Sequence, residues 1–441
     1  MVSAETNERM TRIGPGTPAG KLLRMYWQPA ALAEELTGPR PVKPVRLLGE
    51  DFVLFKDERG RYGLLDRHCA HRRADLVYGR REDGGLRCSF HGWLFDVHGK
   101  CLETPGEPDG GNLCQHVRQR AYPAVERSGI VFAYLGEGAP PAFPDFDCFV
   151  APDAYTFAFK GFVECNWLQI LEVGIDPAHT SFLHRFTEDE DPAANYGRPF
   201  RARTADSDMT ITQVMRQFSR PKIDAQPADY GFRICTRRKI DDLRTHIRVT
   251  HLYFPQAFVI PLSADMTITQ WHVPVDDVTS YWYAIFTSFG DPVNKAEMRD
   301  TRLKLYTLPD YKPRRNRDNA YGFDPHEQTH ATYTGMGADV NVHDQWAVES
   351  QGHIHDRTRE FLGQTDVAIA KYRRLYLDAI DQAEGGQRPP MVLDPDAARK
   401  IQGPMTVDGI GPTGDWEKYW RETYARCRAG AAWAKEPTRA A

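Results

Sequence analysis

The chain has 441 residues, 41% of them hydrophobic, which is enough to bury the core of one large domain or two ordinary ones, so a disordered chain is not expected. Its 56 basic and 60 acidic residues give a formal net charge of −4, and this balance offers no electrostatic attraction to nucleic acid or to an anionic membrane surface. We therefore expect the partner to be a small molecule or another protein.

Residues 1–16 are polar and lack the apolar stretch of a signal peptide, and no later window holds 18 consecutive apolar residues. The eight cysteines are too few for a disulfide scaffold in a chain of this length. These features predict a cytoplasmic protein with reduced thiols and no membrane contact. Some of the cysteines are then available to bind metal.

The first part of the chain is predicted to be rich in short strands and turns, without helical periodicity. We expect an N-terminal segment, 1–42, that packs on the core, and then an all-β domain, 43–148. A Gly/Pro-rich stretch, 136–144, cannot sustain a helix or a central strand and is predicted to be a linker. The strands expected in the all-β domain are 45–48, 52–55, 62–65 and 93–96.

The remainder, 149–441, is predicted to be a second domain in which a mainly antiparallel sheet is flanked by helices, so the chain is placed in the α+β class, as a helix-grip type. In the last predicted helix, Trp416, Trp420 and Tyr424 recur every fourth residue, so their aromatic face should pack on the core or on another subunit. The expected helices are 167–183, 365–384 and 415–432, and the expected strands are 209–218, 231–240, 245–254, 266–273 and 280–288.

Two Cys/His pairs lie in the all-β domain. Cys69 and His71 form the first pair, and Cys88 and His91 follow after 16 intervening residues. A structural zinc would take four such ligands on one ion, whereas a two-iron cluster would take both cysteines on one iron and both histidines on the other. Because each loop supplies one cysteine and one histidine, the spacing favours the two-iron cluster, with zinc as the alternative.

The sequences CAH at 69–71 and CSFHGWLFD at 88–96 resemble the Rieske 2Fe-2S motif. The resemblance implies that Cys69 and Cys88 bind one iron and that His71 and His91 bind the other. It also implies a higher-potential electron relay than an all-cysteine ferredoxin.

This chain departs from the family's pattern at two positions that are not ligands. Relatives commonly have proline after the first cysteine and glycine two residues after the first histidine, where this chain has Ala70 and Arg73. The surroundings that tune the cluster's potential could therefore differ. Two further histidines near the motif, His68 and His98, are expected to be ordinary loop residues.

A second group of candidate ligands lies in the segment 166–184, where His179 and His184 stand beside carboxylates. Two histidines and a carboxylate are what a non-haem Fe(II) site needs. Five residues along a straight helix rotate the side chain by about 140°, so these two histidines can share a metal only if the helix ends or bulges between them. Asp176, directly before Pro177, is also a good helix N-cap.

The pattern Asp176-x-x-His179-x-x-x-x-His184, downstream of a Rieske motif, resembles the catalytic half of the ring-hydroxylating oxygenases. The resemblance implies that His179 and His184 bind a mononuclear Fe(II). It implies that Asp176 is the acid through which an electron passes from a Rieske histidine. In that family the bridge is made between subunits, which implies a homotrimer or a larger ring.

The third ligand is expected far downstream. The segment 342–350 resembles the place where relatives of the phthalate dioxygenase type carry their carboxylate, and this favours Asp344. Glu349, Asp339 and Asp356 remain alternatives. Three histidines nearby, His343, His353 and His355, exceed what the site requires and are expected to lie on the surface or to support the ligands.

The resemblance runs from about residue 14 to residue 358 and is strongest to the branch with phthalate dioxygenase, phenoxybenzoate dioxygenase and the O-demethylases of vanillate and dehydrodivanillate. It implies a terminal oxygenase that oxidises an aromatic acid with dioxygen. The sequence has no dinucleotide fingerprint and no plant-type ferredoxin cysteine run, so the electrons of NAD(P)H should arrive through a separate reductase or ferredoxin.

Within this branch we favour O-demethylation of a methoxylated, lignin-derived (biaryl) aromatic acid, with release of formaldehyde. The alternative is ring dihydroxylation of a phthalate-like or phenoxybenzoate-like carboxylate. A more distant alternative is a non-catalytic Rieske electron carrier or a zinc-stabilised binding protein. A carboxylate substrate calls for an arginine, and candidates lie on or beside the predicted strands: Arg233, Arg237, Arg238, Arg244 and Arg248.

Overall fold

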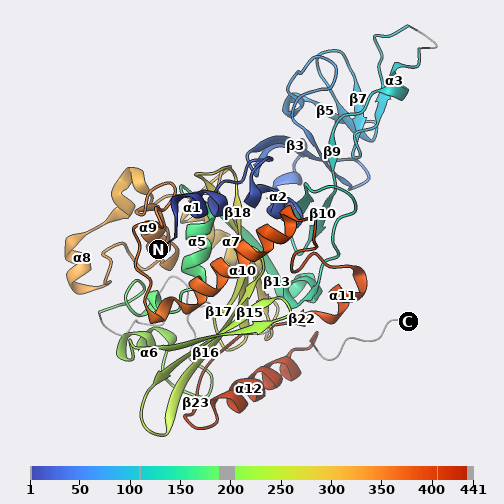
Figure 1. Ribbon diagram of the computed structural model, residues 1–441. Helices are drawn as coiled ribbons and strands as arrows, with labels where there is room; N and C mark the ends of the chain where they lie inside the picture. Colours follow the sequence, from blue (N-terminus) through green and yellow to red (C-terminus); the bar gives the residue numbers. More distant parts are fainter. Residues whose placement is uncertain (1, 109–110, 188–203, 405, 435–441) are drawn as a thin grey trace.

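A computed structural model describes residues 2–108, 111–187, 204–404 and 406–434. Figure 1 shows a small β-rich part that projects from a larger part made of one sheet and several helices. The small part contains two antiparallel sheets, and the expected strands are confirmed there. One sheet has the order β2 (Val42–Leu47), β3 (Glu50–Lys56), β4 (Tyr62–Asp66) and β9 (Ala121–Tyr122), and the other β5 (Arg80–Glu82), β6 (Gly85–Arg87), β7 (Leu94–Asp96) and β8 (Cys101–Glu103).

The N-terminal residues connect the two parts. Helix α1 (Ala4–Thr11) begins at Ser3, whose side chain accepts from the Thr6 amide, and α2 (Pro18–Arg24) begins at Thr17 with proline at its first position. The strand that follows, β1 (Trp27–Leu32), pairs with β11 (Ile130–Tyr134), which also pairs with β10 (Ala124–Arg127).

The larger part is built on an antiparallel sheet. Its order in the described residues is β13-β19-β18-β17-β16-β15-β14, and β23 pairs with β16 beside this path. Side chains alternate between the two faces, so Phe232 and Ile234 join the main core while Cys235 faces the other way. The strands are β13 (Thr156–Val163), β14 (Lys222–Ala228), β15 (Gly231–Lys239), β16 (Arg244–Tyr253), β17 (Ala257–Pro261), β18 (Met266–Pro274), β19 (Ser280–Ser288) and β23 (Val407–Pro412).

Helices cover both faces of this sheet. Apolar side chains of α5 (Trp167–Gly174) and α10 (Val367–Glu384) belong to the main core, whereas α12 (Trp416–Gly430) packs Trp420 against Ile247 and Val249 on the opposite face. The predicted aromatic face of the last helix is thus confirmed as a contact with the sheet. The remaining α-helices are α3 (Leu113–His116), α4 (Asp147–Val150), α6 (Ile211–Gln217), α7 (Lys295–Leu303), α8 (Pro325–His330), α9 (Val340–Glu349) and α11 (Pro395–Lys400).

One predicted strand was wrong, and one predicted helix was too long. The predicted strand 209–218 is the helix α6, because the Thr210 side chain caps it at the Gln213 amide and Val214 and Met215 bury one side. The predicted helix 167–183 stops at Gly174, and only a 3-10 turn, His179–Ser181, follows. No helix in the described ranges has the length and the apolar character needed to cross a lipid bilayer.

Candidate metal centres and active-site cavity

The two Cys/His loops of the small part share one backbone pattern. The Cys69 amide donates to the Ala74 carbonyl and the Arg73 amide donates to the Cys69 carbonyl, at 2.8 and 2.9 Å. The Cys88 loop repeats these bonds with Trp93 and Gly92, at the same two distances. Both cysteines are buried, and burial raises the pKa of Cys69 to about 11, with the neighbouring Cys88 adding to the rise.

The histidines of the two loops lie next to each other. The rings of His71 and His91 have their centroids 4.5 Å apart, and His71 stacks on Trp93 at 4.3 Å. The buried Nδ1 of His71 has no hydrogen-bond partner among the described residues. Two adjacent buried thiols, a buried imidazole nitrogen without a partner and a second histidine fit a cluster bound by two cysteines and two histidines.

Two further residues shape the first loop. Gln119, which the sequence did not single out, donates to the Asp66 and His68 carbonyls and accepts from the Ala70 amide at 2.7 Å. Arg73 has a φ of 62°, a left-handed conformation that glycine adopts more easily. The departure from the family's glycine therefore leaves the backbone of the loop in the conformation that glycine favours.

The end of α5 positions the second group of ligands. Because the helix stops at Gly174, the following turn brings His179 and His184 together, with ring centroids 5.0 Å apart. Asp176 accepts from the Ala178 amide at 2.8 Å, and its other carboxylate oxygen lies 3.7 Å from His179 Nδ1. The α-helix thus ends before both histidines, and only a 3-10 turn that begins at His179 follows, so the straight helix that would hold them apart is absent. Asp176 both caps the turn and faces His179.

Asp344 reaches the same point from α9. Its Oδ1 lies 3.2 Å from His184 Nε2 and 3.7 Å from His179 Nε2, and one ligand atom of each of the three residues falls within 4.8 Å of the others. Within the described residues no donor forms a hydrogen bond to this buried oxygen. A carboxylate oxygen and two imidazole nitrogens that converge in this way fit a 2-His-1-carboxylate metal site.

The electrostatics of this group agree with a cation site. Burial alone would raise the pKa of Asp344, but His184, His179 and His343 outweigh it and the pKa is lowered. Burial likewise acts to lower the pKa of His179, and Asp176 and Asp344 reverse the shift. The ionised form of the carboxylate is thus the stable one at neutral pH.

The other acids considered as ligands have different contacts. Glu349 is buried and accepts from the Glu164 amide and the Tyr321 hydroxyl. Asp339 caps α9, and Asp356 accepts from Thr358. Of the extra histidines, His353 is exposed, His355 lies 3.4 Å from Glu360, and His343 is fully buried beside His184.

A cavity of about 220 Å³ opens directly onto the three converging side chains. Its lining is mainly apolar, with polar groups that include Arg248, Gln270 and His272. Burial lowers the pKa of His272 to about 3, with Asp344 opposing the shift, so this imidazole is neutral. The apolar lining comes from both helices and strands and includes Val163, Ile170, Phe258, Ile268 and Trp282.

Of the five candidate arginines, Arg248 lines this cavity, where it pairs with Asp408. Arg233 and Arg237 lie over the rings of Trp420 and Trp416 on the other face of the sheet, at 4.7 and 4.3 Å. Arg244 is exposed and pairs with Asp241. Arg238 is fully buried and donates to the Pro177 carbonyl at 3.0 Å, so it supports the turn that carries His179.

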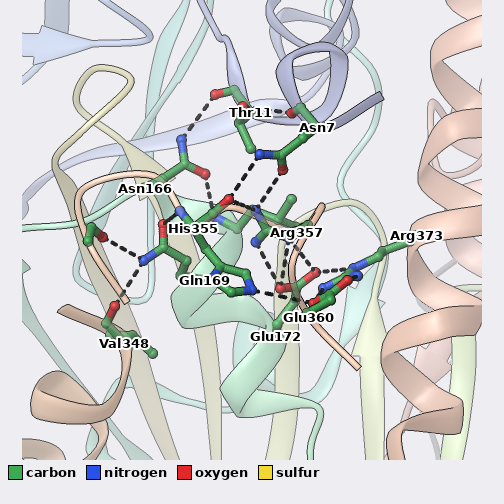
Figure 2. A network of polar contacts seen from close by, with 12 residues as sticks. Asn7, Thr11, Asn166, Gln169, Glu172, Val348, His355, Arg357, Glu360 and Arg373 are labelled. Atoms are coloured by element: carbon green, nitrogen blue, oxygen red, sulfur yellow. Dashed lines mark hydrogen bonds and ion pairs between the residues drawn. The ribbon is translucent and has the colours of Figure 1, made fainter. Parts of the chain in front are cut away.

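A buried ion-pair network holds α5 in place (Figure 2). Glu172 accepts from Arg357 at 2.8 Å and from Arg373 of α10 at 2.6 Å, and Arg373 also pairs with Glu360. The same network reaches α1, because Arg357 donates to the Asn7 side chain at 3.2 Å. The helix that leads to Asp176 is therefore tied to α10 and to the N-terminal helix.

Comparison with known proteins agrees with both metal centres. Residues 26–123 match the Rieske 2Fe-2S domain, and residues 133–430 match the family described as LigXa C-terminal domain like. Among solved structures, dicamba monooxygenase bound to dicamba superposes with a TM-score of 0.53 at 19% identity, over 83% of this chain and 99% of that chain. NdmA of Pseudomonas putida CBB5 reaches a TM-score of 0.54 at 18% identity, over 86% and 97%.

Two relatives match over most of their length. The phthalate 4,5-dioxygenase oxygenase subunit of Pseudomonas putida is 34% identical, over 88% of each chain. The 5,5'-dehydrodivanillate O-demethylase oxygenase subunit of a Sphingobium species is 33% identical, over 91% of this chain and 85% of that protein. The chain therefore belongs to the Rieske non-haem iron oxygenases, a family of oxidoreductases that carry a 2Fe-2S cluster and a mononuclear iron.

Proposed function

We propose that this protein is the terminal oxygenase that removes a methyl group from a methoxylated aromatic acid, with ring dihydroxylation as the alternative reaction. The observation that carries the proposal is the cavity. Its mainly apolar wall also contains His179, His184 and Asp344, and Arg248 lines it as well. Cysteines 69 and 88 with histidines 71 and 91 would hold the cluster. His179, His184 and Asp344 would hold the iron, which when bound supplies the activation of dioxygen.

The size and lining of the cavity support an aromatic acid with a single ring. An engineered apolar cavity of about 150 Å³ is known to take benzene, so a cavity of about 220 Å³ has room for one substituted ring. Its apolar walls suit the ring faces. The guanidinium of Arg248 suits a carboxylate, and the substrate's carboxylate would share this guanidinium with Asp408.

The chemistry balances with one substrate, one dioxygen, a pair of electrons and a pair of protons. One oxygen atom enters a C–H bond of the methoxy group, and the other leaves as water. The resulting hemiacetal breaks its C–O bond to the former methyl carbon and gives a phenol and formaldehyde. Within this chain, His272 and Gln270 are placed in the cavity to hydrogen-bond the substrate's polar substituents, and the apolar lining limits access of water.

The names of relatives support both reactions. Two relatives are named as O-demethylases, for dehydrodivanillate and for dicamba, and others are named as dioxygenases of phthalate and phenoxybenzoate. We favour demethylation within this branch, as for the relatives named as O-demethylases. The electrons would come from a separate reductase or ferredoxin, and a solved relative is an oxygenase–ferredoxin complex.

We also propose that electrons cross between subunits of a homotrimer. In Figure 1 the strand β7, which directly follows the loop of Cys88 and His91, lies in the small projecting part, far from α9, which carries Asp344. Beside Asp176 and His179 is a hollow lined by exposed aromatic side chains: Phe182, Phe323, Tyr333 and Trp346. We propose that this hollow binds the small β-rich part of a second copy, where the aromatic side chains of Tyr78 and Phe90 are exposed near the cluster loops.

The product of one turnover distinguishes the two reactions. The chemically reduced protein is mixed with oxygen and a panel of methoxylated and plain benzoates, and the products are analysed. Formaldehyde with a phenol is expected from a methoxylated acid. A cis-diol without formaldehyde would overturn the proposed demethylation and establish ring dihydroxylation.

A further inference from the structure

One histidine beside the iron site is not among the proposed ligands. His343 on α9 immediately precedes Asp344 and is fully buried. Its Nδ1 lies 3.4 Å from Nδ1 of His184, and the planes of the two rings differ by only 24°. The ring centroids are 5.6 Å apart, which exceeds the nitrogen separation by about two ring radii. The two imidazoles therefore meet edge to edge, as a hydrogen bond in the ring plane requires.

The second nitrogen of His343 fixes the direction of this bond. Nε2 of His343 lies 2.8 Å from the Gly337 carbonyl oxygen, which can only accept. Nε2 must then carry a proton, and in a neutral imidazole Nδ1 is left as an acceptor. The donor in the contact between the histidines is therefore Nδ1 of His184. This tautomer leaves the lone pair of His184 Nε2 directed at the point that Asp344 Oδ1 also faces.

The carbonyl at the end of this chain is itself held firmly. Gly337 has a φ of 81°, a left-handed conformation in which an L side chain is strained, so the position favours glycine. The Gly337 amide donates to Glu327 Oε1 at 2.6 Å, and Thr332 donates to the same oxygen at 2.7 Å. Hydrogen bonds to Glu327 therefore hold the loop that leads into α9, and with it the carbonyl that accepts from His343.

The two histidine ligands thus have different supports. His179 faces the carboxylate of Asp176, whereas Nδ1 of His184 faces the imidazole of His343. We propose that His343 is a positioning residue that fixes the tautomer and ring orientation of His184 and thereby sets the metal affinity of the mononuclear site. The inference rests on the proposed iron site. Supports of this kind typically change metal affinity by about 10- to 100-fold when they are removed.

The test uses the full chain with its cluster retained and the mononuclear site stripped of iron, and Co(II) is the probe. Its dissociation constant is measured by competition with a chelator, and its EPR spectrum is recorded with the cluster oxidised. His343→Leu removes the acceptor, with His343→Met as a second apolar variant should leucine disturb folding. His343→Gln keeps a side-chain oxygen that can accept. His246→Leu is the matched control, since His246 is equally buried but bonds to Asp408 on another strand.

The apolar variants should bind Co(II) about 10- to 100-fold more weakly than the wild type and show an altered EPR spectrum. His343→Gln should stay close to the wild type, and His246→Leu should match it. Unchanged affinity and spectrum in the apolar variants would overturn the inference, and so would a glutamine variant as weak as the leucine variant. A wild type that binds no Co(II) would instead contradict the proposed iron site itself.

Discussion

Arg248 is the residue on which the proposed recognition of a carboxylate depends. Arg248 lines the cavity and pairs with Asp408, which also bonds to His246; these two partners outweigh burial and lower the pKa of Asp408 to about 2. In Arg248→Met, Asp408 keeps His246. We expect KM for a methoxylated benzoate to rise by about 10- to 100-fold while kcat changes little, since a hydrogen bond to a charged group contributes about 1.5–3 kcal/mol.

Arg237→Met is the control for this steady-state measurement. Arg237 stacks on Trp416 on the opposite face of the sheet and should not alter KM. If both variants left KM unchanged, the carboxylate would not bind at Arg248.

His179 should be required for the mononuclear iron and not for the cluster. His179→Ala removes one of the three converging ligand atoms, so the variant should lose that iron and its turnover. The cluster ligands lie on separate loops, and the spectrum of the reduced cluster should remain. Metal analysis together with EPR of the reduced protein checks both points, and loss of the cluster signal would show that the two centres are not independent.

At the residue scale, the sequence was most informative where spacing is local. Cys69, His71, Cys88 and His91 lie within 23 residues, and the loops bring them to one tip. The supporting roles of Gln119 and Arg238 could not be predicted, because nothing near them in the sequence shows which loop they contact; Arg238 was noted only as a candidate to bind a carboxylate. Asp344 and its neighbour His343 were both noted, but only the fold shows that they approach opposite nitrogens of His184.

At the scale of elements, α5 depends on the buried ion pairs of Glu172. Its carboxylate is enclosed with Arg357 and Arg373, which outweigh burial and lower its pKa. Glu172→Gln would leave two buried guanidinium groups without their shared counter-ion, so the free energy of unfolding should fall by about 3–5 kcal/mol at neutral pH. Urea denaturation followed by tryptophan fluorescence measures this change.

The pH dependence of the same variant follows from the direction of the shift. A lowered pKa means that the carboxylate stabilises the fold above its ordinary value of 4.5 and that this contribution is lost as the pH falls through the lower folded value. The difference between wild type and Glu172→Gln should therefore shrink below about pH 4.5. The exposed pair Arg9–Glu384 is the control, and Glu384→Gln should cost less than about 1 kcal/mol. A difference that persists unchanged at pH 3 would contradict this account.

The strands with alternating apolar residues were predicted well. The error arose where a helix cap lies in a segment rich in β-branched residues, which favour strands. The segment 209–218 is rich in Thr, Ile and Val, yet the Thr210 cap and the burial of Val214 and Met215 make part of it helical. Helix α9, which carries Asp344, was not predicted at all. Its pattern is weak because it buries polar residues such as Gln345 and Glu349.

At the scale of the whole molecule, the separation in Figure 1 between the small part that contains β7 and the helix α9 predicts cooperation between subunits. Two inactive variants, His91→Ala without the cluster and His179→Ala without the iron, are expressed together with different tags. Mixed rings should regain about a quarter of the wild-type activity, because an intact cluster then meets an intact iron site at about one junction in four of a randomly mixed ring. Mixed rings without activity would show that electrons stay within one chain.

The presence of a β-rich part followed by a larger antiparallel sheet with helices was predictable from the strand patterns. The strand order was not, because pairings such as β16 with β23 join residues far apart in the chain. The packing of the N-terminal helices on α5 and α10 could not be predicted from the sequence either, because it depends on contacts between distant residues such as Arg357 and Asn7.

The central claim is that electrons held by the cluster are used at His179, His184 and Asp344 to oxidise an aromatic acid. The most direct test is rapid mixing of the reduced protein with oxygen, with and without a methoxylated benzoate, while the absorbance of the cluster is followed. The wild type should reoxidise its cluster rapidly only with substrate present and release formaldehyde, and Asp344→Ala should do neither. Equal rates of reoxidation in the two proteins would contradict the claim.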